Sequence, residues 1–552
     1  MMRATGLRGF GSRVLDSAEN VWRSMQTRRA WPWIALWVFV WLAATTWAYP
    51  LLLPDEGRYV GVAWHMLVSG DFLTPRLDGM PFFHKPPLFY WLTAGALAVF
   101  GDNAWAGRLV SVLSATLLVT GFYVFLRRYE RVSVARRAAL ILAVQPFLFG
   151  AAHYANLDML VAALMGLTVM AGAHAVFQHQ LQRPSHYAIL GMYALAAGGF
   201  MAKGLIGAVL PGGILFFWLL GLRQYRAMGR LLWWPGIVLF LVLISPWMLI
   251  MEVRHPGFFD YYIIYQHFQR FLETGFNNPH PFWFYVPVVL GLTLPWSVQL
   301  WRWFTLHGPL QTHFVPPLER IEQVERPVMR GLMLSWLLVV LVFFSIPSSK
   351  LVGYVIAVLP PLAWFVQETF EQRHEETDPS VARSLVRHAL IAMGLCLLAV
   401  VALLLFPQRT SKPLAQVLAS SAQAGDRLVM FNQFAYDVPM YAHWTSPVIA
   451  VANWEDPGIM RGDDWRRELA DAAQFAPVIG QAVLWTPQRL QASVCEPGRP
   501  DTWIMAWLDE VGRLPVLAGK LPVAKTRKMG LWKLSAADRV NGCAETPSTG
   551  PK

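Results

Sequence analysis

Two adjacent carboxylates, Asp55 and Glu56, stand at the end of the first long apolar run, within the stretch LLLPDEGRYV at residues 51–60. Arg58 and Tyr59 follow at once. A charge near a bilayer normally faces a wet cavity or a partner, and a carboxylate lacks the long stem that lets Lys or Arg reach back to water. The pair therefore indicates a functional site. Asp55 could accept a proton or stabilise an oxocarbenium-like transition state, and Glu56, Arg58 and Tyr59 are candidate substrate contacts.

Further charged side chains are expected on the same face of the membrane, in or beside short loops between apolar runs. They are Lys85, Asp158, Lys203, Arg270 and Lys350. Basic residues such as Lys85 and Arg270 could neutralise a phosphate leaving group, for which arginine offers a planar fork. Such a face suits a reaction between two lipid-borne groups whose polar heads meet in water. Lys203 is a further candidate for binding the donor phosphate, and Lys350 is a candidate substrate contact. The alternative, above all for these two lysines, is ordinary anchoring of helix ends at the interface.

The composition sets the class of protein that must position these residues. The 552 residues are 55% hydrophobic and only 14% charged, with 26 Trp and a mean hydropathy of +0.39. A chain so apolar, with repeated runs of near membrane-spanning length, is typical of a polytopic membrane protein. The net charge of +12 comes from Lys and Arg that mostly flank apolar runs, so it indicates membrane topology and not a nucleic-acid-binding face.

The placement of arginines predicts which runs cross the membrane. Residues 1–30 carry six arginines against two acids, so we expect a cytoplasmic N-terminus and an uncleaved first span at 31–53. The apolar run at 86–101 is short for a span, which favours a helix lying at the interface. If it crossed, the five arginines between residues 127 and 137 would fall outside the cell, against the positive-inside rule.

With that choice the sequence predicts a polytopic α-helical protein of roughly 11 to 13 transmembrane helices with an extracytoplasmic tail. The expected spans are 31–53, 107–126, 138–153, 158–177, 187–202, 204–221, 232–251, 283–302, 329–346, 351–367 and 386–406. We divide the chain into a cytoplasmic N-terminus (1–30), a transmembrane catalytic domain (31–407) and an outer domain (408–552). The catalytic domain includes a first outer loop with juxtamembrane helices (54–106) and an aromatic outer loop (252–283).

The tail alternates short apolar runs with polar helical stretches. The runs are DRLVMF, SPVIAVA and AVLWT, and their pattern predicts a small α/β domain. Cys495 and Cys543 lie in this tail, whereas Cys396 lies in an apolar run. A disulfide between the two tail cysteines could form if the tail is extracytoplasmic.

Four stretches carry a resemblance to a known family over roughly the first 370 residues. They are PDEGRYVGVAWHMLVSGDFLTPRLDGMPFFHKPPLFYWL, RLVSVLSATLL, ANLDML and MAKGLIG. In order and spacing they resemble the lipid-phosphate-dependent GT-C glycosyltransferases, and among these the 4-amino-4-deoxy-L-arabinose transferases that modify lipid A. Protein O-mannosyltransferases are more distant relatives. The resemblance implies a functional Asp55, a role for Asp158, and donor-phosphate contacts by Lys85 and Arg270.

The resemblance also implies an activity. The chain would move 4-amino-4-deoxy-L-arabinose from undecaprenyl phosphate to a lipid A phosphate, at the periplasmic face of a bacterial inner membrane, and so give resistance to polymyxin and cationic peptides. We expect a single inverting displacement and a monomer whose partners are membrane lipids, with no nucleic acid. Two alternatives stay open: transfer to a protein or another envelope glycan, and a glycolipid transporter, although a transporter predicts charges near the bilayer midplane.

One residue departs from the family pattern. Relatives commonly carry Glu before the Lys of the KPP motif, where this chain has His84. His84 could keep a divalent-metal role, since imidazole suits transition metals, but it could not repeat a carboxylate-to-ammonium contact. The alternative is an interfacial His with a satisfied hydrogen bond. No cofactor is required by the expected reaction, in which the polyprenyl-phosphate sugar is a substrate.

Overall fold

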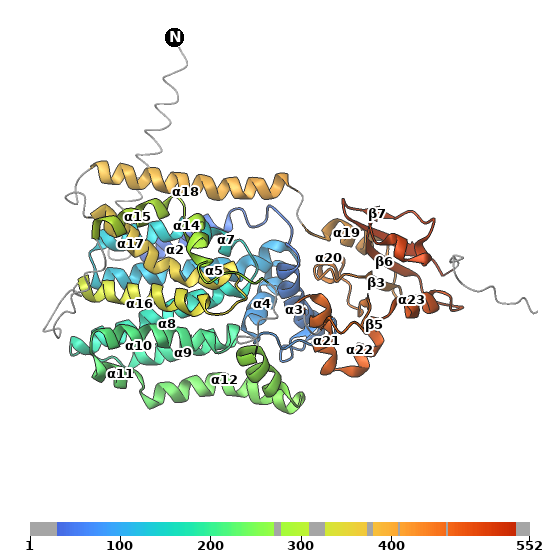
Figure 1. Ribbon diagram of the computed structural model, residues 1–552, viewed down its shortest axis with the longest axis horizontal. Coiled ribbons are helices and arrows are strands. Elements are labelled where there is room, and N and C mark those ends of the chain that lie inside the picture. The colour runs from blue at the N-terminus through green and yellow to red at the C-terminus, as the bar shows by residue number, and fades with distance from the viewer. Residues whose placement is uncertain are drawn as a thin grey trace, which may run out of the picture.

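The computed structural model describes residues 30–269, 278–307, 326–371, 379–406, 409–459 and 462–536. Two parts lie side by side in Figure 1: a helical domain before residue 407 and a C-terminal domain built around a sheet. The elements of the helical domain are α2 (Trp31–Ala43), α3 (Asp55–Ser69), β1 (Arg76–Leu77), β2 (Met80–Pro81), α4 (Leu88–Phe100), α5 (Ala104–Tyr129), α6 (Val132–Ala143), α7 (Pro146–Ala152), α8 (Leu157–Gln180), α9 (His186–Lys203), α10 (Ile206–Gly221), α11 (Tyr225–Leu231), α12 (Trp234–Arg254), the π-helix η1 (Asp260–Gln269), α14 (Tyr285–Leu292), α15 (Trp296–His307), α16 (Arg326–Ser345), the 3₁₀-helix η2 (Val352–Val358), α17 (Leu359–Glu371) and α18 (Pro379–Leu405).

Within the described residues, six helical stretches are long and apolar enough to cross a membrane. They are α5, α8, α12, α16, α18 and the continuous stretch of η2 and α17. A seventh span results if α6 and α7, which are bent by 59°, are one broken span, and α2, α4 and α10 are shorter apolar helices. The chain is therefore a polytopic helical membrane protein, as the sequence predicts.

The apolar runs of the sequence correspond to helices, with local differences. The run at 86–101 forms α4, a 13-residue helix of the length expected for an interfacial element. The run at 31–53 is helical only in its first part, as α2, and the run at 283–302 is divided between α14 and α15. The run at 138–153 is divided between α6 and α7, because Pro146 at the first turn of α7 lacks the amide that would continue a straight helix.

Helix α5 illustrates how local sequence sets an element's ends. Its N-cap is Asn103, whose side chain accepts a hydrogen bond from the amide of Ala106 at 2.9 Å. Its last turn carries Arg127 and Arg128, where the helix dipole favours cations. The same arginines obey the positive-inside rule if this end faces the cytoplasm.

The helical domain has a packed centre and an apolar outside. In the apolar segments of α5 and α8, 78% of the residues are buried, against 28% in α12 and 22% in α18. Figure 1 shows α18 and α12 along opposite edges of the domain. The apolar side chains exposed on them are expected to face lipid. Inside, α9 and α10 meet at two glycines, since a Cβ on Gly207 would lie 2.2 Å from the carbonyl carbon of Gly199.

The C-terminal domain is built around a six-stranded sheet of order β5-β4-β3-β6-β8-β7. Its elements are α19 (Lys412–Ser421), β3 (Arg427–Phe431), α20 (Val438–Ala442), β4 (Ile449–Val451), α21 (Trp465–Gln474), α22 (Pro477–Val483), β5 (Leu484–Trp485), α23 (Pro487–Val494), β6 (Thr502–Trp507), η4 (Val511–Arg513), η5 (Pro515–Leu517), β7 (Ala524–Lys525) and β8 (Met529–Leu534). Strands β3, β4, β5 and β6 run parallel to one another, β8 is antiparallel to its neighbour β6, and β7 is antiparallel to β8. The predicted runs DRLVMF, SPVIAVA and AVLWT contain β3, β4 and β5.

The cysteines of the described residues differ in state. Cys396 is a buried free thiol, and Cys495, at the end of α23, is disulfide-bonded. Cys543 lies outside the described residues, as do Arg270 and the N-terminal residues 1–29.

The two domains touch through the first helix after the opening apolar run. A Cβ on Gly57 of α3 would lie 3.1 Å from the amide nitrogen of Asp437, and one on Gly61 would lie 2.9 Å from the carbonyl oxygen of Tyr436. The two glycines, four residues apart, share one face of the helix. Their lack of side chains lets α3 pack directly on the backbone of the C-terminal domain.

Candidate active site

The two acids that open α3 point in different directions. Asp55 and Glu56 are both in the first turn, where the helix dipole stabilises negative charge. Neighbouring residues of a helix are about 100° apart around its axis, so their side chains separate. The side chain of Asp55 is 36% exposed, whereas that of Glu56 is completely buried.

Glu56 forms a closed ion-pair network inside the helical domain. Its two oxygens accept from Nε and Nη2 of Arg108 on α5 at 2.8 and 2.7 Å. They also accept from the amides of Leu52 and Ala155 at 2.8 and 2.7 Å. The guanidinium in turn donates to three backbone carbonyls ahead of α3, those of Thr46, Tyr49 and Pro50.

This Glu56–Arg108 node fixes the start of α3. Both side chains are fully buried, and their polar atoms are occupied by protein groups. Both oxygens of Glu56 are therefore occupied by protein donors, which indicates a positioning role instead of the substrate contact that its sequence position suggests. Arg108 lies in the RLVSVLSATLL motif, and its spacing from Glu56 gives no sequence signal that the two would pair.

Asp55 has fewer partners than Glu56. Its Oδ1 accepts from Nη2 of Arg58 at 2.6 Å and its Oδ2 accepts from the Tyr154 hydroxyl at 3.3 Å. Burial raises the pKa of Asp55 above its ordinary value, although Arg58 lowers it, and the charges of Glu468 and Asp158 raise it further. A raised pKa strengthens a carboxylate as a proton acceptor.

Arg58 joins Asp55 to the C-terminal domain. Its guanidinium is also ion-paired with Glu468 of α21, and Glu468 accepts a hydrogen bond of 2.5 Å from the Tyr436 hydroxyl. The guanidinium lies 5.0 Å from the ring centroid of the buried Tyr59, which serves as its platform. The structure thus brings the predicted Asp55, Arg58 and Tyr59 together.

Sequence reasoning missed the contribution of the C-terminal domain. Glu468 and Asp471 lie on one side of α21, whose N-cap Asp464 accepts from the amides of Arg466 and Arg467. Acids at i and i+3 share a helix face, a pattern visible in the stretch WRRELADAAQ. The pattern does not say what that face meets, because Glu468 lies 410 residues from its partner Arg58.

Asp158 and Lys203 form a second charged pair. Asp158 is in the first turn of α8, and its amide donates to the N-cap Asn156 at 3.0 Å. Nζ of Lys203, in the last turn of α9, is ion-paired with Asp158 and lies 4.4 Å from the ring centroid of Tyr354. A Cβ on Gly353 would lie 2.3 Å from Oδ2 of Asp158, so glycine is needed there. Lys203 is already neutralised by Asp158 in this structure.

His84 and Lys85 lie between β2 and α4. The His84 ring stacks on Phe82 with centroids 4.5 Å apart, and its Nε2 lies 3.6 Å from Oδ2 of Asp471. The same Asp471 oxygen accepts from the Tyr261 hydroxyl of η1 at 3.0 Å. Lys85 is partly exposed beside His84. The β1–β2 hairpin, η1 and α21 therefore meet at this point.

A metal site at His84 does not fit the neighbouring donors. Across the described residues, no group of three His, Cys, Asp or Glu side chains is placed to hold a metal ion. His84 and Asp471 alone fall short of the three or four protein ligands typical of zinc sites.

Lys350, the remaining predicted residue, is committed to its own loop. It is only 2% exposed, and its Nζ donates to the carbonyl of His280 at 3.0 Å and to that of Pro347. These contacts tie the loop after α16 to the segment before α14. Neither of these two hydrogen bonds joins Lys350 to the Asp55 cluster, and a role of Lys350 in substrate binding stays a prediction.

Comparisons with known proteins agree with this geometry. Residues 84–250 match the family described as dolichyl-phosphate-mannose-protein mannosyltransferase. A protein of Pseudomonas aeruginosa named undecaprenyl phosphate-alpha-4-amino-4-deoxy-L-arabinose arabinosyl transferase is 30% identical over 500 residues, which is 88% of this chain and 80% of that protein. A protein of the same name from Pseudomonas paraeruginosa is 29% identical over 504 residues, with the same coverage.

A solved structure shares the fold. The crystal structure of ArnT from Cupriavidus metallidurans, bound to undecaprenyl phosphate, superposes with a TM-score of 0.74 at 23% identity. The match covers 92% of this chain and 98% of the other, so both the helical domain and the C-terminal domain take part in it.

Proposed function

Because the chain belongs to the family of undecaprenyl phosphate-4-amino-4-deoxy-L-arabinose arabinosyl transferases, we propose that it transfers 4-amino-4-deoxy-L-arabinose from undecaprenyl phosphate to a phosphate group of lipid A. The enzyme is a membrane-embedded, lipid-phosphate-dependent glycosyltransferase. The observation that carries the proposal is the contrast at the start of α3, where Glu56 is sealed in the interior while Asp55 keeps an exposed oxygen-bearing side chain beside Arg58.

The proposed reaction is a single displacement with inversion. An oxygen of the acceptor phosphate forms the bond to the anomeric carbon, while the bond from that carbon to the donor phosphate oxygen breaks and its electron pair leaves with undecaprenyl phosphate. A lipid A phosphate is already anionic at neutral pH and needs little base assistance. Asp55 would then stabilise the positive charge that develops on the sugar and orient the acceptor. With a protein hydroxyl as acceptor, Asp55 would act as the general base.

Four basic residues are candidates to contact the leaving phosphate. Lys85 is partly exposed in the loop before α4, and Arg58 already contacts Asp55. Lys203 could turn to the donor phosphate if its pairing with Asp158 were exchanged. Arg270 lies outside the described residues and stays a predicted phosphate contact. A positive charge about 4 Å from a phosphate oxygen is worth about 4 kcal/mol at an effective dielectric of 20.

The proposed location is the bacterial inner membrane with the site facing the periplasm. The start of α5 lies beside α3 and α4, and its other end carries Arg127 and Arg128. Arg136 and Arg137 follow in α6. The positive-inside rule puts these arginines in the cytoplasm, which leaves Asp55 and the C-terminal domain outside. We propose that the enzyme acts as a monomer on lipid substrates.

Mass spectrometry of lipid A tests the proposed function. A Gram-negative strain that lacks its own transferase would express this protein, the variant Asp55→Asn, or Asp509→Asn as a matched control at an exposed carboxylate of the C-terminal domain. We expect the mass increment of an aminoarabinose with the native protein and with the control, and none with an equally abundant Asp55→Asn. Polymyxin resistance should follow the increment, because an amino sugar reduces the negative charge of lipid A. A native protein that is abundant but adds no increment would move the proposal to another acceptor.

A further inference from the structure

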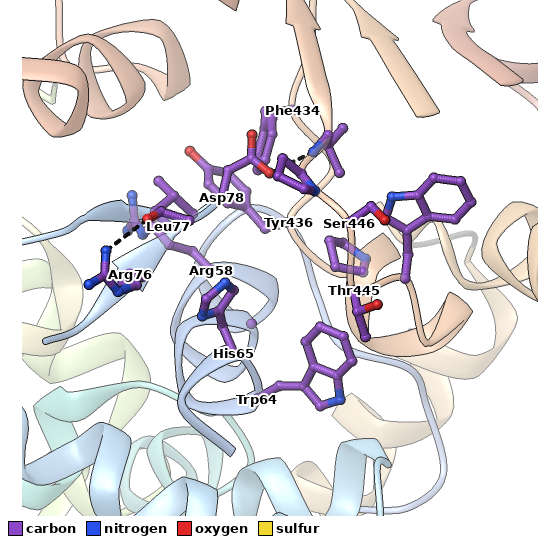
Figure 2. Close-up of a pocket in the computed structure, with 16 residues that line it drawn as sticks. Arg58, Trp64, His65, Arg76, Leu77, Asp78, Phe434, Tyr436, Thr445 and Ser446 are labelled. Atoms are coloured by element: carbon purple, nitrogen blue, oxygen red, sulfur yellow. Dashed lines mark hydrogen bonds between the residues drawn. The ribbon is translucent and has the colours of Figure 1, made fainter. Parts of the chain in front are cut away.

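A hollow lies where α3, the β1–β2 hairpin and residues 434–448 of the C-terminal domain meet (Figure 2). Its empty space, counted together with the part that is open to solvent, amounts to about 530 Å³. We call it the hairpin pocket. Arg58 lines it and also pairs with Asp55, so the pocket adjoins the candidate active site without containing Asp55.

Four buried polar atoms of the lining have no hydrogen-bond partner within the described residues. They are Oδ2 of Asp78, Nδ1 of His65, Nε1 of Trp444 and Nε of Arg58. Buried polar groups in folded proteins are nearly always hydrogen-bonded, so four such atoms around one hollow point to a polar ligand or ordered water. Together they offer both donors and acceptors, as Figure 2 illustrates for the labelled Asp78 and His65.

The tip of the β1–β2 hairpin holds Asp78 in place. Asp78 and Gly79 both have positive φ, 51° and 78°, as a two-residue turn between antiparallel strands requires. Oδ1 of Asp78 accepts from the amide of Val448 at 2.8 Å, which ties the hairpin to the C-terminal domain. Burial raises the pKa of Asp78 to about 7, so near neutral pH this carboxyl group exists in both a form that donates and a form that only accepts.

Aromatic rings and hydroxyl groups complete the lining. Trp64, Trp444 and Tyr436 contribute rings, and Thr445 and Ser446 contribute exposed hydroxyl-bearing side chains. Rings beside a few fixed polar groups are what a small polar ligand with apolar faces requires. A sugar ring combines apolar C–H faces with hydroxyls at its edge, and it fits this combination.

The distance along α3 from Asp55 to His65 separates the place where the pentose is transferred from the far part of the hairpin pocket. His65 is ten residues from Asp55, which is about 15 Å along a helix axis that rises 1.5 Å per residue. A single sugar ring is about as wide as one helical turn of ~5.4 Å. A pentose that reacts at Asp55 therefore does not reach the far part of the pocket, whereas a second ring of the acceptor can.

We propose that the hairpin pocket is an acceptor subsite that binds a sugar ring of the acceptor's saccharide headgroup, beyond the group that receives the transferred pentose. The proposal rests on the proposed function for its assignment to the acceptor. It gives the C-terminal domain a part in acceptor recognition, through Trp444, Thr445 and Ser446.

A specificity ratio tests the subsite with the purified full-length enzyme. The acceptors are a glycolipid phosphate with two sugar rings and an acylated glycolipid phosphate with one ring. We expect Asp78→Ala and Trp444→Ala to lower the ratio of kcat/KM for the two-ring acceptor to that for the one-ring acceptor by about tenfold or more. Asp509→Ala should leave this ratio unchanged. An equal loss with both acceptors, as a loosened domain contact would cause, or a change confined to the KM of the donor, would overturn the proposal.

A binding measurement separates this proposal from the proposed function. Saturation-transfer NMR would use the deacylated two-ring saccharide phosphate with native protein and with Trp444→Ala. Saturation of ring protons that disappears in the variant supports the subsite even if the native enzyme transfers no sugar to lipid A. Absence of saturation with native protein, which would mean that water alone fills the pocket, overturns the subsite even if transfer to lipid A is observed.

Discussion

Carboxylates in the interior of the helical domain and at its contact with the C-terminal domain differ in burial and in how many of their oxygens have hydrogen-bond partners. At the Glu56–Arg108 node every polar atom has a protein partner and both side chains are fully buried. At the domain contact, Asp55 is partly exposed and Asp78 has an oxygen without a partner among the described residues, and the pKa of each is raised. A node whose polar atoms are all hydrogen-bonded can hold a backbone in place. Carboxylates with an exposed or unpartnered oxygen can still bind a ligand or react.

The largest expected effect comes from breaking the node. Removing one partner of a buried ion pair leaves an uncompensated charge and costs about 3–5 kcal/mol. We expect Glu56→Ala and Arg108→Ala each to lower the Tm of the purified protein strongly, as followed by tryptophan fluorescence. The double variant Glu56→Ala with Arg108→Ala should be less destabilised than the sum of these two single changes. Additive losses would show that the pair is not coupled.

Loss of the Arg58–Glu468 contact between the domains is expected to shift the pH dependence of activity. The charge of Glu468 raises the pKa of Asp55, so Glu468→Gln should lower it. If Asp55 works as an ionised carboxylate, the acid limb of the pH–rate profile then moves to lower pH. Steady-state kinetics between pH 4 and pH 8 measure this shift. A limb that stays in place or moves to higher pH would contradict the assignment of the limb to Asp55.

The smallest expected effect concerns Asp78. Its folded pKa of about 7 lies above the ordinary value of an aspartate, so the folded state binds a proton more tightly than the unfolded state. This contribution to stability is present in full below the ordinary pKa and is lost as pH rises to about 7. In Asp78→Asn that loss should vanish, while the side-chain oxygen still accepts from Val448. The Tm of the variant relative to native protein should therefore rise between pH 5 and pH 8, and a constant difference would refute the burial argument.

The sequence predicts much of the helical architecture, because apolar runs and flanking arginines report on the bilayer directly. The run at 86–101 forms the short α4, and its position at the interface stays a prediction. Residues 138–153 form two helices bent by 59°, which a hydropathy pattern cannot distinguish from one straight span. The strand-like runs of the tail also correspond to β3, β4 and β5, since buried parallel strands are continuous apolar segments.

The candidate site is only partly visible in the sequence. Asp55, Arg58 and Tyr59 cluster because they share the start of one helix. The opposite roles of Asp55 and Glu56 depend on how α3 is rotated against α5, and that rotation is set by packing with Arg108. Glu468 and Asp78 enter through the contact between domains, for which local spacing carries no information. Lys350 has the expected charge but is held by backbone carbonyls of its own loop.

The most direct test of this account compares the turnover and the Tm of Asp55→Asn with those of the native enzyme, using purified protein, a polyprenyl-phosphate aminoarabinose donor and lipid A. Loss of a group that stabilises charge in the transition state should reduce kcat by about 10²-fold or more. The Tm should change little, since Asp55 is partly exposed. A variant that keeps native turnover would contradict the central claim that Asp55 performs the chemistry, and one that unfolds would show that Asp55, like Glu56, serves the fold.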